Sequence, residues 1–420
     1  MDVVRWSAAS LLGGGAAALL LAPAPARLRA QDTTSAEPTR RLPPSSIREA
    51  LGHRALGPSC VPTEFIIGDS AGADAATIRG ALRRAQDDDA CSVRLRLAPG
   101  EHRGSFRVDR DTEILGPTGG RASVHGTVSV RGPHTLRIRS VHLRHAGRPG
   151  ALIVADRGAR VVLTTLTISG AAGYGIRQRG GELLLDRVNV FGTRALSAFS
   201  GSGVGIALSD GARVRLRGVT LAGNEAQALV ASGPDTRVRA RRLLVVNTGH
   251  RARSPLADDD VHGVGAVEVR RGAAMLASRL RMSDSEGVGI QVHDGGRLHV
   301  RGGLVRGTRK TDRESGVNVA VVDGTAELHD VTLSGADLAG LLVARGGTVS
   351  LAGSTVSRNA VGVALRSDVP LECLRRRVVY RDNGVNLDAS GPTLPETDLP
   401  PADGGERASD RAVCARVPWR

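Results

Sequence analysis

The chain has 420 residues and a formal charge of +15, and only 2% of its residues are aromatic. This length usually indicates two or three domains, but one repeat pattern runs through most of the chain, which indicates a single domain. No segment after residue 30 is long and apolar enough to cross a bilayer, which excludes a protein with several membrane spans.

Residues 1–30 have the three parts of a secretory signal in the usual order. Arg5 gives the start a positive charge, residues 8–21 form an apolar run, and a stretch rich in Pro and Ala ends at Ala30. We expect cleavage after Ala30, or after Ala26, because the run is short for a membrane span; an uncleaved N-terminal anchor is the alternative. The sequence therefore predicts a secreted, periplasmic or cell-surface protein.

The four cysteines fit an exported protein, because disulfides form and persist in oxidising compartments. Cys60 and Cys91 lie near the start of the mature chain, and Cys373 and Cys414 lie near its end. Of three connectivities, the simplest pairs Cys60 with Cys91 and Cys373 with Cys414, one disulfide at each end. Four free thiols are the alternative.

Positive charge is the main electrostatic feature of the mature chain. Removal of residues 1–30 takes away three Arg and one Asp and leaves about +13, almost all of it from Arg, since Lys310 is the only lysine. Such a charge favours anionic surfaces, for example uronate polymers, lipopolysaccharide or nucleic acid. The Arg residues follow every repeat without clustering, so a purely solubilising role is the alternative.

Residues 31–59 are rich in Thr, Ser, Pro and Arg, which predicts a flexible lead-in. Asp74 then stands where it can cap a helix over residues 74–85, with Ile78, Leu82 and Ala85 on one face. Residues 93–97 alternate strictly between apolar and polar side chains, which is typical of a β-strand.

From this point a repeat of about 22–24 residues combines short alternating strands with glycine turns. Such a unit cannot bury its apolar face alone, so neighbouring units must stack. A leucine-rich repeat is excluded by the lack of its Leu/Asn consensus, and a propeller blade needs about forty residues. The turn glycines of successive units are Gly132, Gly158, Gly180, Gly211, Gly233, Gly272, Gly295, Gly324 and Gly346.

We therefore predict an all-β fold, a single-stranded right-handed parallel β-helix of about ten rungs over residues 60–390. The helix at residues 74–85 would cover its first rung, and residues 391–420 would form a C-terminal tail or cap, because exposed rung edges invite aggregation.

Three segments resemble the opening of pectate-lyase-like right-handed β-helix proteins: residues 77–82 (Thr-Ile-Arg-Gly-Ala-Leu), 95–102 (Leu-Arg-Leu-Ala-Pro-Gly-Glu-His) and 112–116 (Thr-Glu-Ile-Leu-Gly). The resemblance covers about residues 62–387 and implies the fold. It implies little about activity, because this superfold carries lyases, hydrolases, epimerases, adhesins and proteins without known activity.

The motifs of catalytic members of the superfold are present only as fragments. Its hydrolases carry Asn-Thr-Asp, Asp-Asp, Gly-His-Gly and Arg-x-Lys motifs; this chain has adjacent Asp259 and Asp260 and adjacent Arg309 and Lys310, but no Asn-Thr-Asp and no Gly-His-Gly. Asp260, Val261 and His262 resemble part of the Asp-Pro-His-Asp motif of alginate epimerases. These departures argue against hydrolase and epimerase activity.

Three long turns decorate one position of the repeat. After the first interval, short units space their turn glycines 22 or 23 residues apart, whereas alternate units take 31, 39 and 29 residues. The extra residues fall at 192–202, 247–262 and 307–315. Loops on alternate rungs would lie about 10 Å apart, and insertions on one face often mark a binding face. The alternative is that inserts collect wherever the coil tolerates them.

These loops contain the candidate site residues. Adjacent carboxylates can bind Ca²⁺ or provide an acid or base, a histidine can transfer protons, and a cation can neutralise a uronate carboxylate during β-elimination. Solvated surface is the alternative for each. The candidate catalytic residues are Asp258, Asp259, Asp260, His262, Lys310 and Arg313, and the candidate substrate-binding residues are Phe199, His250, Arg251, Arg253 and Arg309.

Two further patterns favour structural roles. Asn224, Asn247, Asn359 and Asn383 recur at one turn, which predicts a ladder of amide hydrogen bonds along the stack. His293, His299 and His329 lie on alternating strands and have no partner at metal-ligand spacing, so we interpret them as surface residues.

The favoured hypothesis is a monomeric exported solenoid that binds an anionic glycan or cell-envelope component through its Arg-rich surface and the loop edge. The alternative is a polysaccharide lyase that acts on uronate polymers. Few aromatic residues are available to stack on sugars, which favours an acidic glycan over a neutral one, and nothing indicates specific binding of nucleic acid.

The cysteine pairing is testable by thiol labelling. We expect the mature protein to react with iodoacetamide only after reduction, at all four cysteines, and non-reducing peptide mapping to recover Cys60 linked to Cys91 and Cys373 linked to Cys414. Labelling of unreduced protein would contradict the prediction.

Overall fold

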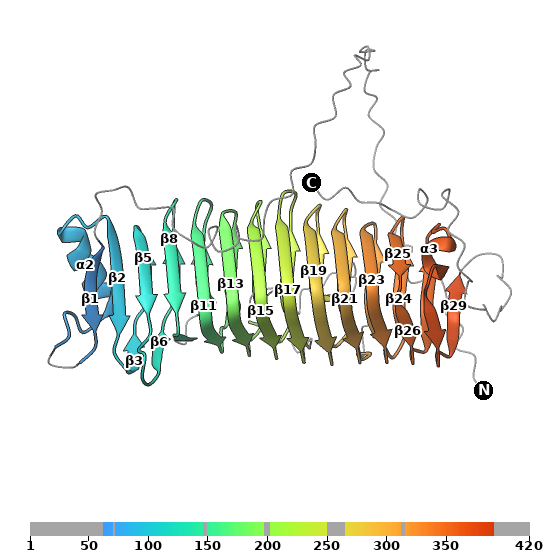
Figure 1. Cartoon of the computed structure of the whole chain (residues 1–420), viewed down its shortest axis with the longest axis horizontal. Helices are drawn as coiled ribbons and strands as arrows, with labels where there is room; N and C mark the ends of the chain where they lie inside the picture. Colours follow the sequence, from blue (N-terminus) through green and yellow to red (C-terminus); the bar gives the residue numbers. More distant parts are fainter. Residues whose placement is uncertain are drawn as a thin grey trace, which may run out of the picture. The chain divides into compact units, whose positions relative to one another are not determined.

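The chain forms a coil of stacked parallel strands (Figure 1). Side chains alternate along each strand, and one of the two sets is buried inside the coil. The computed structural model describes residues 62–69, 72–145, 149–196, 202–249, 265–311 and 316–389. Each rung of the coil contributes to two parallel sheets, and strands pair with equivalent strands of the next rung. This topology confirms the predicted all-β solenoid.

One sheet has 12 strands, where the glycine spacing predicted about ten rungs. Its strands are β4 (Phe106–Val108), β7 (Val128–Val130), β10 (Gly150–Ala155), β12 (Gly173–Arg179), β14 (Val204–Ser209), β16 (Gln227–Ser232), β18 (Gly265–Arg270), β20 (Val288–His293), β22 (Val317–Val322), β24 (Ala339–Ala344), β27 (Val361–Arg366) and β29 (Val385–Ala389).

The other sheet has 17 strands. They are β1 (Thr63–Ile67), β2 (Ser92–Leu97), β3 (Gly100–Arg103), β5 (Asp111–Leu115), β6 (Ala122–His125), β8 (Thr135–Arg139), β9 (His142–Arg144), β11 (Arg160–Ser169), β13 (Glu182–Phe191), β15 (Arg213–Ala222), β17 (Arg237–Val246), β19 (Ala274–Ser283), β21 (Arg297–Arg306), β23 (Thr325–Ser334), β25 (Thr348–Ala352), β26 (Thr355–Ser357) and β28 (Val379–Arg381).

The larger sheet bends at one residue per rung. Arg187, Gly218, Arg242 and Gly302 each have a positive φ at equivalent positions inside the long strands. On an earlier rung the same position separates β8 from β9, which pair with the two halves of β11. The bend divides this sheet into two faces, so the coil has three sides. We call the surface formed by the strand halves before the bend the first outer face.

The interior is filled by small apolar side chains, mainly Val, Leu, Ile and Ala. They form one continuous core that runs through the rungs, and full burial of each larger side chain contributes about 1.5–3 kcal/mol.

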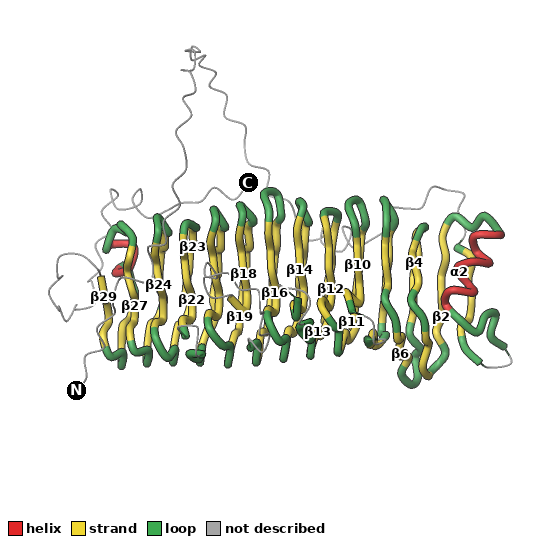
Figure 2. Tube along the Cα trace, turned by 180° about the vertical axis from the view of Figure 1, so that it is seen from behind, coloured by secondary structure: helices red, strands yellow, loops and turns green. Residues whose placement is uncertain are grey.

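Two short helices lie at opposite ends of the coil, α2 (Ile78–Asp87) beside β1 and β2 and α3 (Glu372–Arg375) at the other end (Figures 1 and 2). Ile78, Ala81 and Ala85 of α2 join the core. The predicted helix cap was wrong: Thr77 accepts the capping hydrogen bond from the Gly80 N–H. The Asp74 carboxylate instead accepts one from the Ile66 N–H, because it lies in the preceding turn.

The corner between the second half of each long strand and the 12-stranded sheet stacks equivalent residues. Thr193, Asn224, Thr248 and Ser285 follow one another in a chain of backbone hydrogen bonds, and all four are buried. The long turns at residues 192–202, 247–262 and 307–315 begin at this corner, so their first residues lie along one edge of the coil.

The predicted asparagine ladder is present in part. The Asn359 amide donates to the Asn383 side chain at 3.1 Å and to the Leu333 carbonyl at 3.3 Å. Asn224 stands at the same corner, but its amide has no hydrogen-bond partner within the described structure. Asn247 lies outside the ladder. It has a positive φ and comes one residue before the stacked position, which Thr248 occupies.

Other predictions concern parts that the structure covers incompletely. In the described ranges, no cysteine is free and no helix is long and apolar enough to span a membrane. The signal and lead-in at residues 1–59, the tail at residues 391–420, Cys60 and Cys414 lie outside these ranges, so the signal and both cysteine pairings remain predictions.

Replacement of Asn359 tests the ladder. We expect Asn359→Ala to lower the free energy of unfolding by about 1–3 kcal/mol, since it leaves the buried Ala336 N–H, which donates to the Asn359 side chain at 2.9 Å, without an acceptor. Asn189→Ala, at an exposed position of β13, is the matched control and should change the value by less than about 0.5 kcal/mol. Urea unfolding followed by circular dichroism measures both; equal effects would contradict the ladder.

Candidate functional site on the first outer face

The structure describes two of the predicted site residues. Arg309 and Lys310 are exposed at the corner where the third long turn begins. The Arg309 guanidinium lies 3.9 Å from the Asp284 carboxylate, and the Lys310 backbone N–H donates to Asp337 at 2.7 Å. The other candidates lie outside the described residues, namely Phe199, His250, Arg251, Arg253, Asp258, Asp259, Asp260, His262 and Arg313.

Arginine residues cluster on the first outer face, across two neighbouring strands. β15 and β17 each present three outward arginines, and parallel pairing aligns them one to one. All six are exposed. We call them the arginine block: Arg213 opposite Arg237, Arg215 opposite Arg239, and Arg217 opposite Arg241.

Few carboxylates neutralise this block. Arg217 lies 3.8 Å from Asp186 and Arg237 lies 3.9 Å from Asp235, which is itself largely exposed. Among the described residues, the other four arginines form no ion pair. Like charges directly opposite one another destabilise a sheet, so the arginine block lowers the stability of the fold unless anions screen it.

The expectation of unclustered arginines was therefore wrong. Along the sequence, β15 and β17 are separated by a strand of the other sheet, which makes their arginines look dispersed. One rung later the chain comes back to the same sheet, and the two stacked strands lie about 4.8 Å apart. A sequence signal existed: the Arg-x-Arg-x-Arg pattern occurs in both segments, at residues 213–217 and 237–241.

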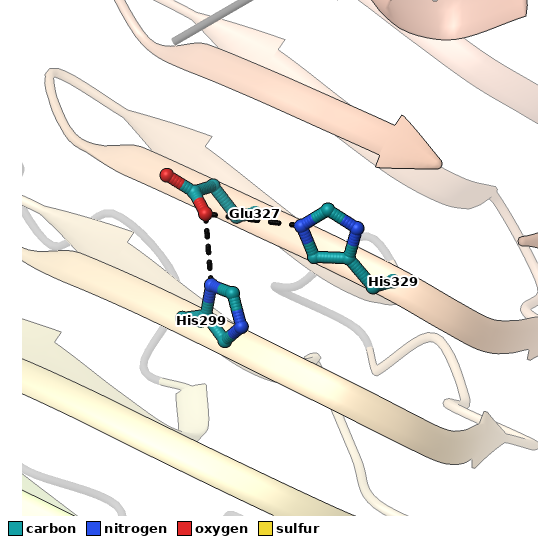
Figure 3. Close-up of side chains that lie close together, drawn as sticks. All are labelled: His299, Glu327 and His329. Atoms are coloured by element: carbon teal, nitrogen blue, oxygen red, sulfur yellow. Dashed lines mark hydrogen bonds and ion pairs between the residues drawn. The ribbon is translucent and has the colours of Figure 1, made fainter. Parts of the chain in front are cut away.

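A second group lies on the same face, on β21 and β23. The His299 ring contacts Glu327 of the next rung, with 2.8 Å between Nδ1 and Oε2, and Nε2 of His329 is 3.8 Å from the same oxygen (Figure 3). We call these three residues the His–Glu cluster. Arg301 donates from Nε to Nε2 of His299 at 2.8 Å. Burial lowers the pKa of His299, in spite of the hydrogen bond to Glu327.

The interpretation of His299 as a surface residue without a metal-spacing partner was wrong, and the error came from register. Only 3% of His299 is exposed, and it pairs with Glu327 on the neighbouring strand. If the two repeats are aligned on their turn glycines, Gly295 and Gly324, His299 falls opposite Leu328. The structural partner is Glu327 instead, because the turn before β21 has one residue more than the turn before β23. A slip of one residue exchanges the two faces of a strand.

A third group lies on the outer side of the 12-stranded sheet. The buried Glu268 carboxylate lies 2.8 Å from Nε2 of His293 and 2.9 Å from Arg270, and Gln227 also donates to it. Next to it is a hollow lined by Gln291, His293, Asp294, Val322, Asp323 and Arg345. His293 is thus a half-buried ion-pair partner, where the sequence predicted a surface residue.

Burial and neighbouring charges shift the pKa values of Glu268 and His293 in opposite directions. Burial disfavours the charged form of both groups, but the hydrogen bond and charge of Glu268 outweigh it and raise the pKa of His293. In return, His293, Arg270 and Gln227 overcome burial and lower the pKa of Glu268.

Comparison with known proteins supports the fold and leaves the activity open. No protein-family model and no curated protein matches the chain. Among solved structures, the periplasmic alginate epimerase AlgG is similar, with a TM-score of 0.50, 12% identity and coverage of 71% of this chain and 76% of that one. The chain thus has the fold of a right-handed parallel β-helix protein.

Two further solved structures are similar at lower TM-scores. The Azotobacter vinelandii mannuronan C-5 epimerase AlgE4 A-module matches at 13% identity over 75% of this chain and 93% of that one, with a TM-score of 0.41. Pectate lyase Pel9A matches at 9% identity over 80% and 83% of the two chains, with a TM-score of 0.30.

The Glu268–His293 pair predicts a pH dependence of stability. A raised His293 pKa stabilises the fold below about pH 6.5, its unfolded value, and the contribution is lost as pH rises through the folded pKa. A lowered Glu268 pKa stabilises the fold above about pH 4.3 and is lost as pH falls through its folded pKa. The pair therefore contributes most between these limits.

We expect His293→Gln to lower Tm by about 2–4 °C near pH 5.5 and by less near pH 9. His134→Gln, at a partly exposed histidine, is the control and should behave like the parent at both values. Differential scanning calorimetry gives the Tm values; a pH-independent difference would contradict the pair.

Proposed function

We propose that this chain is an exported β-helix protein that binds an acidic polysaccharide along the first outer face. The observation that carries the proposal is the arginine block, six exposed cations in register on two adjacent strands. Export rests on residues 1–30. The long turns begin at a corner that does not border the first outer face, so the proposed surface does not include the loop edge.

The geometry of the block suits a chain of carboxylates. Stacked arginines lie about 4.8 Å apart along the coil axis, and next-but-one residues lie about 7 Å apart along a strand. A guanidinium binds a carboxylate through two parallel hydrogen bonds, which gives direction as well as charge. A polymer with a carboxylate on each sugar can therefore meet several arginines at once, and the separate contacts reinforce one another.

The lack of aromatic side chains in the strand halves before the bend narrows the ligand class. Between residues 213–217 and 237–241, these halves present only arginine outward. Neutral sugars and single-stranded nucleic acids are usually held by stacking on aromatic rings. An acidic glycan needs no such stacking. AlgG is named an alginate epimerase, and alginate is for that reason the first glycan to test.

A lyase activity on uronate polymers is the second candidate, and the His–Glu cluster favours it. A neutral histidine hydrogen-bonded to a carboxylate is suited to abstract a proton through its other ring nitrogen. In His299 that nitrogen accepts from Arg301, so the ring can act as a base only after Arg301 turns away to neutralise a substrate carboxylate. Lys310 lies at another corner of the coil, and the remaining predicted catalytic residues lie outside the described ranges. Absorbance of an unsaturated product during incubation with alginate or pectate separates this candidate from binding alone.

Neutralisation of the block should separate binding from stability. We expect the triple variant Arg215→Gln, Arg239→Gln and Arg241→Gln to weaken binding of alginate oligosaccharides at least about tenfold, because each charged hydrogen bond contributes about 1.5–3 kcal/mol. Its Tm should stay equal or rise, since three mutually repelling charges are removed. Calorimetric titration at low and moderate salt measures the affinity, which should fall with salt.

The control variant removes the same charge elsewhere, at Arg83, Arg107 and Arg381, which are exposed and form no ion pair within the described structure. It should bind alginate nearly as well as the parent. Equal loss in both variants would indicate unspecific attraction by net charge and overturn the proposal. Tighter binding of DNA than of alginate, heparin or lipopolysaccharide would assign the block to nucleic acid instead.

A further inference from the structure

The His–Glu cluster has the composition and geometry of a metal site. We propose that His299, Glu327 and His329 bind a divalent transition-metal ion of the zinc type. One ligand atom from each residue lies within 4.8 Å of the other two. The proposal is independent of glycan binding.

The distances are close to those that a bound ion requires. Ligand atoms at about 2.0–2.2 Å from a tetrahedral zinc ion lie about 3.3 Å from one another. Here the Glu327 oxygen is 2.8 Å from the His299 ring and 3.8 Å from the His329 ring. The two imidazole centroids are 5.1 Å apart. Small rotations of the three side chains would thus create three corners of a coordination tetrahedron.

The backbone holds the three side chains in place. Glu327 and His329 are next-but-one residues of β23, so both point outward, and His299 is the register partner of Glu327 on β21. Figure 3 shows all three side chains converging between the two strands. Because paired strands fix their Cα positions, binding orders only side chains and loses little conformational entropy.

The ligand set determines the class of ion. Two imidazoles and one carboxylate suit zinc and neighbouring transition metals, whereas Ca²⁺ and Mg²⁺ require mainly oxygen ligands. His299 and Glu327 are buried, and His329 is partly exposed at the solvent side. The fourth position would therefore lie beside His329, where water or an anionic ligand can enter.

Arg301 competes with the ion. It donates to Nε2 of His299, which places the proton of the neutral ring on Nδ1, facing Glu327. Metal binding at Nδ1 requires the other tautomer, with the proton on Nε2, so the Arg301 contact must break. Arg301 is exposed and can turn into solvent. Its removal should strengthen metal binding, whereas loss of a ligand should weaken it.

The test uses the full mature chain, treated with EDTA and titrated with Zn²⁺ against a chromophoric chelator. We expect each chain to bind one zinc ion at the His–Glu cluster. The affinity for this ion should be at least tenfold lower in His329→Ala and several-fold higher in Arg301→Gln. His329 is partly exposed, so its variant should fold; circular dichroism checks this. His293→Ala, which removes a histidine beside another carboxylate, is the control and should bind zinc like the parent.

Substitution with Co²⁺ supplies a second readout, because a tetrahedral site with nitrogen ligands gives an intense visible absorption band that His329→Ala should lose. Ca²⁺ should not compete. Failure of both the parent and Arg301→Gln to bind zinc would overturn the proposal. So would zinc binding that survives His329→Ala, because the ion would then lie at another site.

Discussion

The structure depends on the register of its parallel rungs. Each strand pairs with its equivalent one turn later, so a side chain stacks on the side chain at the same position of the next rung. Inside the coil, this stacking makes a continuous apolar core. Outside, it makes columns, and any residue type that recurs at one position adds to a column about 4.8 Å at a time.

Two adjacent columns on the first outer face contain the His–Glu cluster and four of the six arginines of the block. One column runs through Arg215, Arg239, Leu276, His299 and Glu327. The next runs through Arg217, Arg241, Ser278, Arg301 and His329. Since only β19 separates the arginine block from the His–Glu cluster, Arg239 and His299 are two rungs, or about 10 Å, apart.

Much of the fold could be predicted because its determinants are local. Alternation and turn glycines are visible in any single repeat, and they suffice for parallel stacking. The sites were missed because they depend on register between repeats, which changes with turn length. One residue more in the turn before β21 than in the turn before β23 hides the contact between His299 and Glu327. The Asp74 and Asn247 predictions failed for a similar reason, a shift between neighbouring polar residues at a turn.

Because the two sites share columns, their ligands are expected to affect each other. An acidic glycan that follows the coil axis from the arginine block reaches the His–Glu cluster within about 10 Å. A divalent ion there would add positive charge to the path, and a glycan carboxylate could supply its fourth ligand. Linkage makes this coupling reciprocal: if the ion strengthens glycan binding by some factor, the glycan strengthens metal binding by the same factor. Arg301, between the two, would then be released from His299 by the ion and become free to bind the glycan.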